Sequence, residues 1–318
     1  MPEPPWKTVV VTDGRAGNEA QALALAEALS RAVPVVTESV QVESASWATA
    51  LPPAVLHGLG LALTGLRTRL PEGADLLIGA GRRAGPVVAA AGRRSGAATV
   101  QLMAPQMPLS AFSLVVAPSH DGLEGPNVLS SIGALSRITK VRVNEAARTW
   151  PRSNLPPEPR LAVLVGGPSK SAEFEASDWE HLIALLNAAS KTHSLLITPS
   201  RRTPEDLQTR LIDQFAADHF VWDGSGANPY PGLLRLVEAV LVTADSVNMA
   251  SEAASTGLPV HVMPVTKLAP KLAKFHADLE ARGASRQVAL PLQSWAYDPL
   301  AEADRAAEEV IKRLGWDS

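Results

Sequence analysis

The 318-residue chain contains no cysteine. This absence excludes disulfides, cysteine-ligated zinc, iron–sulfur clusters and a thiol nucleophile, and it is neutral on compartment. Aromatic residues make up only 4% of the chain, which leaves little surface for stacking nucleobases. No apolar run approaches the roughly 18 residues that a membrane-spanning helix needs. The first residues, MPEPPWK, lack the apolar stretch of a signal peptide.

A surplus of positive charge is also missing. The chain has 29 Lys and Arg against 32 Asp and Glu, for a net charge of -3. We therefore expect no nucleic acid among its partners. With 46% hydrophobic and 19% charged residues the composition is globular, and the length suits two domains. We predict a cytoplasmic protein, or one that is peripheral at the inner face of a membrane.

Short apolar runs alternate with helical patterns along the whole chain. Near-continuous apolar strands separated by helices are typical of a parallel sheet covered on both faces, so we predict an α/β fold. Strands are expected at Lys7–Thr12, Val33–Val42, Ala74–Ala80, Ala98–Met103 and Leu114–Pro118, and again at Leu161–Val165, Ser194–Thr198, Phe220–Trp222, Ala239–Thr243 and Pro259–Met263.

A proline-rich segment divides this alternation into two halves. Thr149–Pro159 holds four prolines in eleven residues, which predicts a stiff linker. We expect two doubly wound, Rossmann-like domains, residues 1–156 and residues 157–296, followed by a helix in residues 297–318. Because ligands bind beyond the carboxyl ends of parallel strands, we expect the site in a cleft between the domains.

The first candidate loop follows the strand at Leu161–Val165. It reads Gly166-Gly167-Pro168-Ser169-Lys170. Paired glycines let backbone N–H groups approach a phosphate, and the lysine adds positive charge. The spacing is not that of a P-loop. An ordinary strand-to-helix turn is the alternative.

The second candidate loop carries two arginines. Ser200, Arg201 and Arg202 precede Thr203, a predicted N-cap that is followed by a proline at the first helical position. Guanidinium groups and a helix N-terminus both attract anions, so we favour an anion site over two solvated arginines.

The third candidate segment is TADSVNMASEAASTG. Ser246 is predicted to cap a helix that ends at Gly257, and Asn248, Ser251 and Glu252 recur along that helix. A carboxylate at this place can accept hydrogen bonds from both hydroxyls of a ribose. The alternative is an exposed, normally capped helix.

The first half offers two candidate bases at strand ends. Asp13 opens the loop Asp13-Gly14-Arg15-Ala16-Gly17, whose spacing is not that of a dinucleotide-binding loop. It is either a catalytic carboxylate or a loop cap. His120, next to Asp121, is the other candidate. The seven histidines and the acids show no metal-ligand spacing, so we predict no metal site.

Two further segments complete the list of candidates. Asp223 begins a glycine-rich, turn-forming loop that runs to Tyr230. The apolar segment Val55–Leu66 is too short to span a membrane, so it is either core or a face that docks on a membrane surface.

Several of these segments together resemble the family named for the plant mitochondrial fission factor Elongated Mitochondria, which has many bacterial members. The resemblance rests on DGRAGNEAQ, PSHDGLEGPNV, TPSRRTP, DGSGANPYPGLL and TADSVNMASEAASTGLPV. The second half of that family is also similar to GT-B glycosyltransferases. In those enzymes a glycine pair cradles the diphosphate and a glutamate before a G-x-P turn binds the ribose. The matching residues here are Gly166, Gly167 and Glu252.

This resemblance implies a UDP- or GDP-linked sugar as ligand and no required cofactor. It implies that residues 157–296 bind the nucleotide sugar, that residues 1–156 lie on the acceptor side, and that the helix in residues 297–318 crosses back to the first domain. It implies a metal-independent glycosyltransferase acting on a lipid-linked or cell-envelope glycan acceptor, with Arg201 and Arg202 at the leaving diphosphate and Asp13 or His120 as base. Two alternatives stay open: a nucleotide-sugar epimerase, and a non-catalytic adaptor that recruits division or fission machinery to a membrane.

Overall fold

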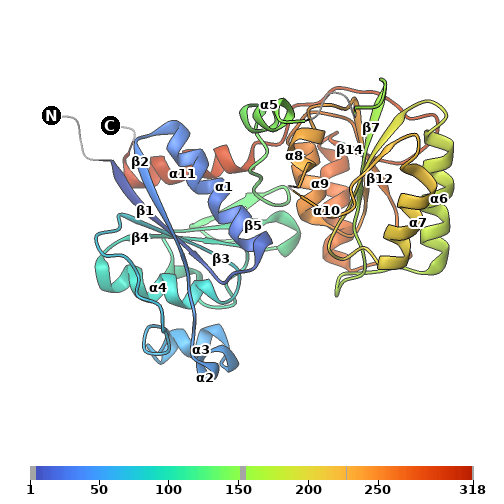
Figure 1. The fold of residues 1–318 in the computed structure, drawn as a ribbon. Helices are drawn as coiled ribbons and strands as arrows, with labels where there is room; N and C mark the ends of the chain where they lie inside the picture. Colours follow the sequence, from blue (N-terminus) through green and yellow to red (C-terminus); the bar gives the residue numbers. More distant parts are fainter. Residues whose placement is uncertain (1–4, 151–154, 227, 317–318) are drawn as a thin grey trace. The chain divides into compact units, whose positions relative to one another are not determined.

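The computed structural model describes residues 5–150, 155–226 and 228–316. Two compact units are formed, which we describe separately (Figure 1). Unit 1 runs to Arg137 and includes the chain again from Ala301, and unit 2 comprises Ile138–Leu300. Of the predicted linker, residues 151–154 lie outside the described part of the chain.

Over the described residues, unit 1 contains a six-stranded parallel sheet in the order β2-β1-β3-β4-β5-β6. Its strands are β1 (Trp6–Thr12), β2 (Val35–Gln41), β3 (Leu76–Ala80), β4 (Ala98–Leu102), β5 (Leu114–Pro118) and β6 (Val128–Ser131). The order reverses at β1, because the chain moves outward to β2 and then returns to β3 on the other side. In parallel α/β sheets, such a reversal is where ligands commonly bind, here at the carboxyl ends of β1 and β3.

Helices cover both faces of this sheet, and neighbouring residues of β1 face opposite sides. Val10 packs with α1 (Ala16–Ala32) and α11 (Glu302–Leu314), whereas Val9 and Val11 pack with α4 (Ala84–Ser95). Figure 1 shows α1 and α11 together on one side of the sheet and α4 on the other. This alternation explains why the strand is apolar throughout.

The C-terminal helix α11 belongs to unit 1, as predicted. The Arg31 guanidinium lies 2.6 Å from the Asp304 carboxylate, and the rings of Trp6 and Trp316 stack with centroids 4.7 Å apart. The last helix of the chain therefore completes the core that the first strand begins.

Unit 2 repeats the architecture. Its described strands form a six-stranded parallel sheet in the order β10-β9-β7-β11-β12-β14. They are β7 (Arg160–Val165), β9 (Ser194–Pro199), β10 (Phe220–Val221), β11 (Ala239–Thr243), β12 (Val260–Met263) and β14 (Ser285–Gln287), and β8 (Ala172–Glu173) pairs with β13 (Lys267–Leu268) in a small antiparallel ribbon.

The helices of unit 2 again lie on both faces of its sheet. Figure 1 shows α6 (Ala176–Ala189) and α7 (Glu205–Phe215) on one side, with α9 (Val247–Ala254) and α10 (Pro270–Ala281) on the other. Two shorter helices, α5 (Lys140–Arg148) and α8 (Tyr230–Leu233), pack against each other. The contact is close because Gly232 lacks a Cβ, which would lie 2.9 Å from the Ala146 carbonyl oxygen.

The predicted α/β class with parallel sheets is confirmed, and the apolar strands lie within a few residues of their predicted bounds. Strands β6 and β14 were not predicted, because they are short and carry polar residues. Helix α5 was not predicted either. Because α5 packs on α8, unit 2 begins at Ile138, before the segment predicted as the linker.

The apolar segment Val55–Leu66 is divided in the structure. It contains most of α3 (Pro53–Gly58), which follows α2 (Ser46–Ala50), and then a series of turns. Leu56 and Ala62 are buried, as the core interpretation requires, but Val55 and Leu59 are exposed. Within the described residues, no helix is both long and apolar enough to cross a membrane.

Candidate functional site

Three of the predicted loops meet at one edge of the sheet in unit 2. Strands β9, β7 and β11 are neighbours and parallel, so their carboxyl ends lie side by side. The Gly166 N–H donates to the Thr243 hydroxyl over 2.8 Å, and the Arg202 guanidinium donates to the Gly167 carbonyl over 2.8 Å. Segments far apart in sequence are thus tied into one site.

Asp245 is the centre of this arrangement. Its side chain is 0% exposed, and it accepts hydrogen bonds from the Gly167 N–H at 3.1 Å and the Thr243 hydroxyl at 2.6 Å. Arg202 completes the set, with a guanidinium nitrogen 2.6 Å from the same carboxylate. A buried carboxylate persists only with such partners, because desolvation of a charge is costly.

Both N–H groups of the glycine pair bond to side chains of the protein. The N–H groups of Gly166 and Gly167 are occupied by Thr243 and Asp245, so in this arrangement they do not meet a phosphate. A Cβ on Gly166 would lie 2.0 Å from the Asp245 carboxylate, and one on Gly167 would lie 1.9 Å from the Arg202 carbonyl. Glycine is required because other groups approach the backbone this closely.

The predicted N-cap at Thr203 is wrong. Helix α7 begins at Glu205 with Pro204 as its N-cap, and the Thr203 hydroxyl instead donates to the carbonyls at the end of β7 and accepts from the Ser200 N–H at 2.9 Å. The Ser200 hydroxyl accepts from the Arg202 N–H at 3.2 Å. These bonds hold the loop that carries the arginine pair.

The two arginines differ in their surroundings. Arg202 is engaged with Gly167 and Asp245, whereas the Arg201 side chain is exposed and forms no ion pair with any described residue. Of the two arginines, Arg201 is therefore the one whose charge is available to an anion at this edge.

Helix α9 begins as the sequence predicts. The Ser246 hydroxyl accepts from the Met249 N–H at 3.3 Å, and Gly257 adopts a φ of 80° soon after the helix ends. Asn248 is partly exposed near its first turn, whereas Ser251 is fully buried and points into the packing. Of the predicted polar face, Asn248 is thus accessible and Ser251 is not.

Glu252 occupies an unusual environment on α9. The residue as a whole is half-buried, and its carboxyl group is the buried part. Burial raises the pKa of this carboxyl to about 7. The Tyr230 hydroxyl and Arg142 lower the pKa, but they offset only part of the effect of burial. The same burial raises the pKa of the Tyr230 hydroxyl well above its usual value. The Tyr230 hydroxyl faces Glu252 without a hydrogen bond of standard geometry. A carboxyl with a pKa this far from normal is typical of functional sites.

This pKa has a consequence for stability. Because the carboxyl of Glu252 titrates near 7 in the folded chain and near 4.5 when solvated, the folded state binds its proton more tightly. We expect the free energy of unfolding to fall by about 2 kcal/mol between pH 5 and pH 8 relative to Glu252→Gln. Urea unfolding of both proteins at the two pH values measures this. A difference that does not vary with pH would contradict it.

The remaining predicted binding residues of unit 2 mainly organise their own loops. The Ser169 hydroxyl accepts from the Ser171 N–H at 3.1 Å, and Lys170 is exposed. Asp223 accepts from the N–H and hydroxyl of Ser225, and the hydroxyl bond is the main reason why its pKa is lowered.

Asp13, in unit 1, directly follows the carboxyl end of β1, where the strand order reverses. Its side chain is 4% exposed, and it accepts hydrogen bonds from Asn18 and from the Arg15 N–H, both at 3.2 Å. Asn18 in turn packs against Gly81, where no Cβ would fit. Asp13 therefore holds the loop together, and its carboxylate lies at the ligand end of the strand.

His120 lies in the short helix η2 (Ser119–Asp121), directly after β5. Strands β3 and β4 lie between β1 and β5, so the strand ends that precede Asp13 and His120 are about 14 Å apart. The structure does not pair these two candidate bases. In the described part of the chain, no three acidic or histidine side chains are grouped to hold a metal ion.

Sequence reasoning overlooked His276 on α10. Its Nε2 lies 2.7 Å from the Ala244 carbonyl, and burial lowers the pKa of its imidazole, so the neutral ring donates this hydrogen bond. The bond fixes the backbone next to Asp245. Nothing near His276 in the sequence indicates this contact, because it joins α10 to the end of β11.

This architecture is found in solved structures. A UDP-GlcNAc 2-epimerase from Methanocaldococcus jannaschii superposes with a TM-score of 0.60 at 12% identity, over 98% of this chain and 99% of that one. Its structure in complex with UDP-GlcNAc and UDP gives a TM-score of 0.57 at 12% identity over the same shares of the two chains. The fold is therefore the GT-B architecture, and an identity this low establishes the fold alone.

Sequence comparison places the chain in a family. The model of the family described as Mitochondrial fission ELM1 matches residues 16–314, so the chain belongs to that family. It is 31% identical over 251 residues to the mitochondrial fission protein ELM1 of Arabidopsis thaliana, covering 68% of this chain but only 58% of that protein. It is 26% identical to the protein RP120 of Rickettsia prowazekii, over 95% of this chain and 97% of that one.

Proposed function

We propose that unit 2 binds a nucleoside diphosphate sugar, linked to UDP or GDP, at the carboxyl edge of its sheet. The observation that carries this proposal is the Glu252 carboxyl, which is desolvated and held beside Tyr230 on a helix that begins at that edge. A ribose offers two adjacent hydroxyls, and a single carboxylate can accept a hydrogen bond from each.

The diphosphate is assigned to the first turn of α9 and to Arg201. A helix N-terminus presents backbone N–H groups and a partial positive charge, and Arg201 adds a full charge that is not neutralised in the described structure. Gly166, Gly167 and Arg202 act indirectly in this proposal, because they hold Asp245 and the neighbouring loops in place.

Replacing Glu252 by alanine tests the ribose contact. We expect UDP binding to weaken by about 1–3 kcal/mol, because a charge-assisted hydrogen bond is lost. Calorimetric titration of UDP measures the change, and Glu280→Ala, an exposed glutamate on α10, is the matched control. Unchanged UDP affinity in the folded Glu252→Ala protein would remove Glu252 from the site.

We expect nucleotide binding without a divalent metal. The sequence contains no Asp-x-Asp motif, and Arg201 with the α9 N-terminus supplies the positive charge instead. Excess EDTA should therefore leave UDP affinity unchanged in calorimetry. A large loss of affinity that magnesium or manganese restores would contradict this expectation.

The proposed activity is transfer of the sugar to a lipid-linked or cell-envelope glycan acceptor, at the inner face of a membrane. Asp13 is the proposed base and His120 the alternative. An epimerase is the second candidate, because UDP-GlcNAc 2-epimerases share the architecture over 98% of this chain. Incubation with a nucleotide sugar separates the two, since an epimerase converts it without any acceptor. The adaptor hypothesis instead predicts no thermal stabilisation by any UDP or GDP derivative.

A further inference from the structure

A pocket in unit 2 lies away from the proposed nucleotide site. Its volume is about 600 Å³, which is within the range of small-molecule sites. It lies at the start of β7, whereas Gly166 follows the end of that strand, and a strand of this length spans about 17 Å. The pocket is therefore at the opposite edge of the same sheet.

Positive charge gathers in this pocket without a matching number of carboxylates. The Arg160 guanidinium pairs with Glu158 at 3.0 Å and donates to the Leu236 carbonyl at 3.1 Å, so it serves the local structure. Arg148 and Arg235 are exposed and form no ion pair with the residues that the structure describes. Two guanidinium groups are left without a counter-charge.

A hydrogen bond fixes the geometry of these donors. The Arg235 Nε donates to the Asn144 Oδ1 over 2.8 Å, so the Asn144 amide presents its NH₂ group on the other side. Asn144 and Arg148 lie four residues apart on α5 and hence on the same face of the helix. The Glu158 carboxylate also lines the pocket, but it is paired with Arg160. Asn144, Arg148 and Arg235 present donors, which fit the oxygens of an anion.

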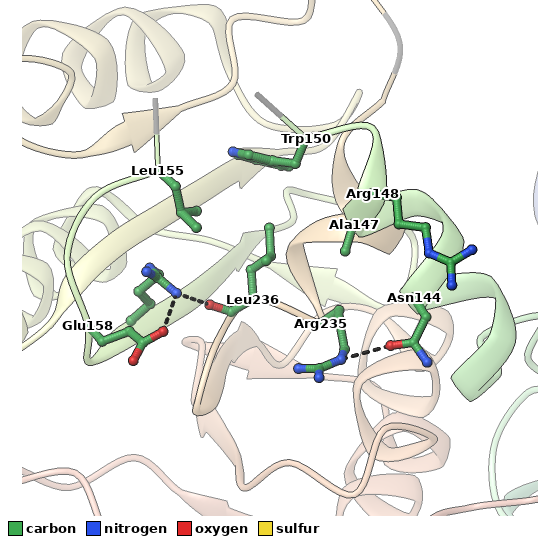
Figure 2. A pocket seen from close by; sticks show the side chains of 9 residues that line it. Asn144, Ala147, Arg148, Trp150, Leu155, Glu158, Arg235 and Leu236 are labelled. Atoms are coloured by element: carbon green, nitrogen blue, oxygen red, sulfur yellow. Dashed lines mark hydrogen bonds and ion pairs between the residues drawn. The ribbon is translucent and has the colours of Figure 1, made fainter. Parts of the chain in front are cut away.

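The apolar residues of the pocket lie next to the Arg160–Glu158 ion pair. Figure 2 shows the flat ring of Trp150, with Leu155 and Leu236 nearby. Trp150 is 8% exposed, and its ring meets that of Phe220 edge-on with centroids 4.8 Å apart. Its indole nitrogen has no hydrogen-bond partner in the described structure, so packing alone holds the ring. Such a wall suits an aromatic or acyl group.

We propose that this pocket binds a small organic anion: a carboxylate, sulfonate or phosphate monoester attached to an aromatic or acyl body. The anion contacts Arg148, Arg235 and the Asn144 amide, and the apolar body lies against Trp150 and Leu236. The size of the pocket, its unbalanced positive charge and its single apolar wall support this assignment. It does not depend on the nucleotide site.

The probe is anilinonaphthalene sulfonate, an aromatic anion whose fluorescence rises in apolar sites, titrated into the full chain. We expect saturable binding that weakens about tenfold or more in Arg148→Gln/Arg235→Gln, because two charge-assisted contacts are lost. Arg282→Gln, an exposed arginine at the end of α10, is the matched control and should change the affinity less than about twofold. Uncharged phenylnaphthylamine should bind more weakly than the sulfonate.

Two further measurements keep the result decisive. If the double variant does not fold, Arg148→Gln alone replaces it, since that side chain forms no hydrogen bond or ion pair with the described residues, and it should weaken binding about threefold or more. Saturating UDP should leave the dye affinity unchanged. Equal affinity in the arginine variants and the wild type, equal binding of phenylnaphthylamine, or displacement of the dye by UDP would each overturn the proposal.

Discussion

Replacing Arg202 by alanine is expected to destabilise unit 2 by about 2–4 kcal/mol, whereas Arg201→Ala should change its stability by less than about 0.5 kcal/mol. The two arginines are neighbours in the sequence, but only Arg202 meets the Asp245 carboxylate, at 2.6 Å. That carboxylate is 0% exposed, so removing the guanidinium leaves a buried charge with neutral donors only. Arg202 is itself 37% exposed, which keeps the expected loss below that of a fully buried pair.

Hydrogen exchange in increasing urea measures this prediction locally. Peptides from β7 and β11 report on the sheet edge that Arg202 holds, and peptides from β1 and β3 in unit 1 are the internal control. Asp245→Asn offers a second view, because asparagine keeps an acceptor for the Gly167 N–H but loses the charge. Equal protection of β7 in the Arg201 and Arg202 variants would show that the ion pair does not stabilise the site.

The sequence predicts which loops share one edge of the sheet better than it predicts the hydrogen bonds that join them. The apolar strands β7, β9 and β11 are visible in the sequence because parallel strands are buried on both faces, and their ends locate the polar loops. The short, partly polar strands β6 and β14 lack this signal, since each has exposed residues along its length.

The roles of individual residues depend on contacts between distant segments. Gly167 looks like part of a phosphate loop, but it is glycine because the Arg202 carbonyl takes the space of a Cβ. Thr203 has the sequence context of an N-cap, but its hydroxyl donates a hydrogen bond to the Val165 carbonyl at the end of β7. A local pattern lists the bonds that a residue can form, and the tertiary structure selects among them. Asp245 is a further example. It belongs to the segment TADSVNMASEAASTGLPV, but the residues around it in the sequence do not indicate that its side chain is buried.

Replacing Asp13 by asparagine is expected to lower the proposed sugar transfer by about 10²–10⁴-fold with little change in donor affinity. The acceptor hydroxyl must lose its proton as the sugar–phosphate bond breaks, and Asp13 is a carboxylate at the carboxyl end of β1, where the strand order reverses. Asparagine keeps the oxygen that accepts from Asn18 and from the Arg15 N–H, so the loop should remain folded while the base is lost.

Controls separate catalysis by Asp13 from its role in the loop. Asp75→Asn changes a carboxylate that accepts from the Lys7 N–H at 2.7 Å near the other end of β1, and it should leave transfer unchanged. Donor affinity and urea unfolding are measured for both variants beside the transfer rate. If Asp13→Asn is less stable but transfers at the normal rate, Asp13 is a structural residue and His120→Gln becomes the decisive variant. If neither Asp13→Asn nor His120→Gln slows transfer, neither residue is the base, and the proposed transfer mechanism is contradicted.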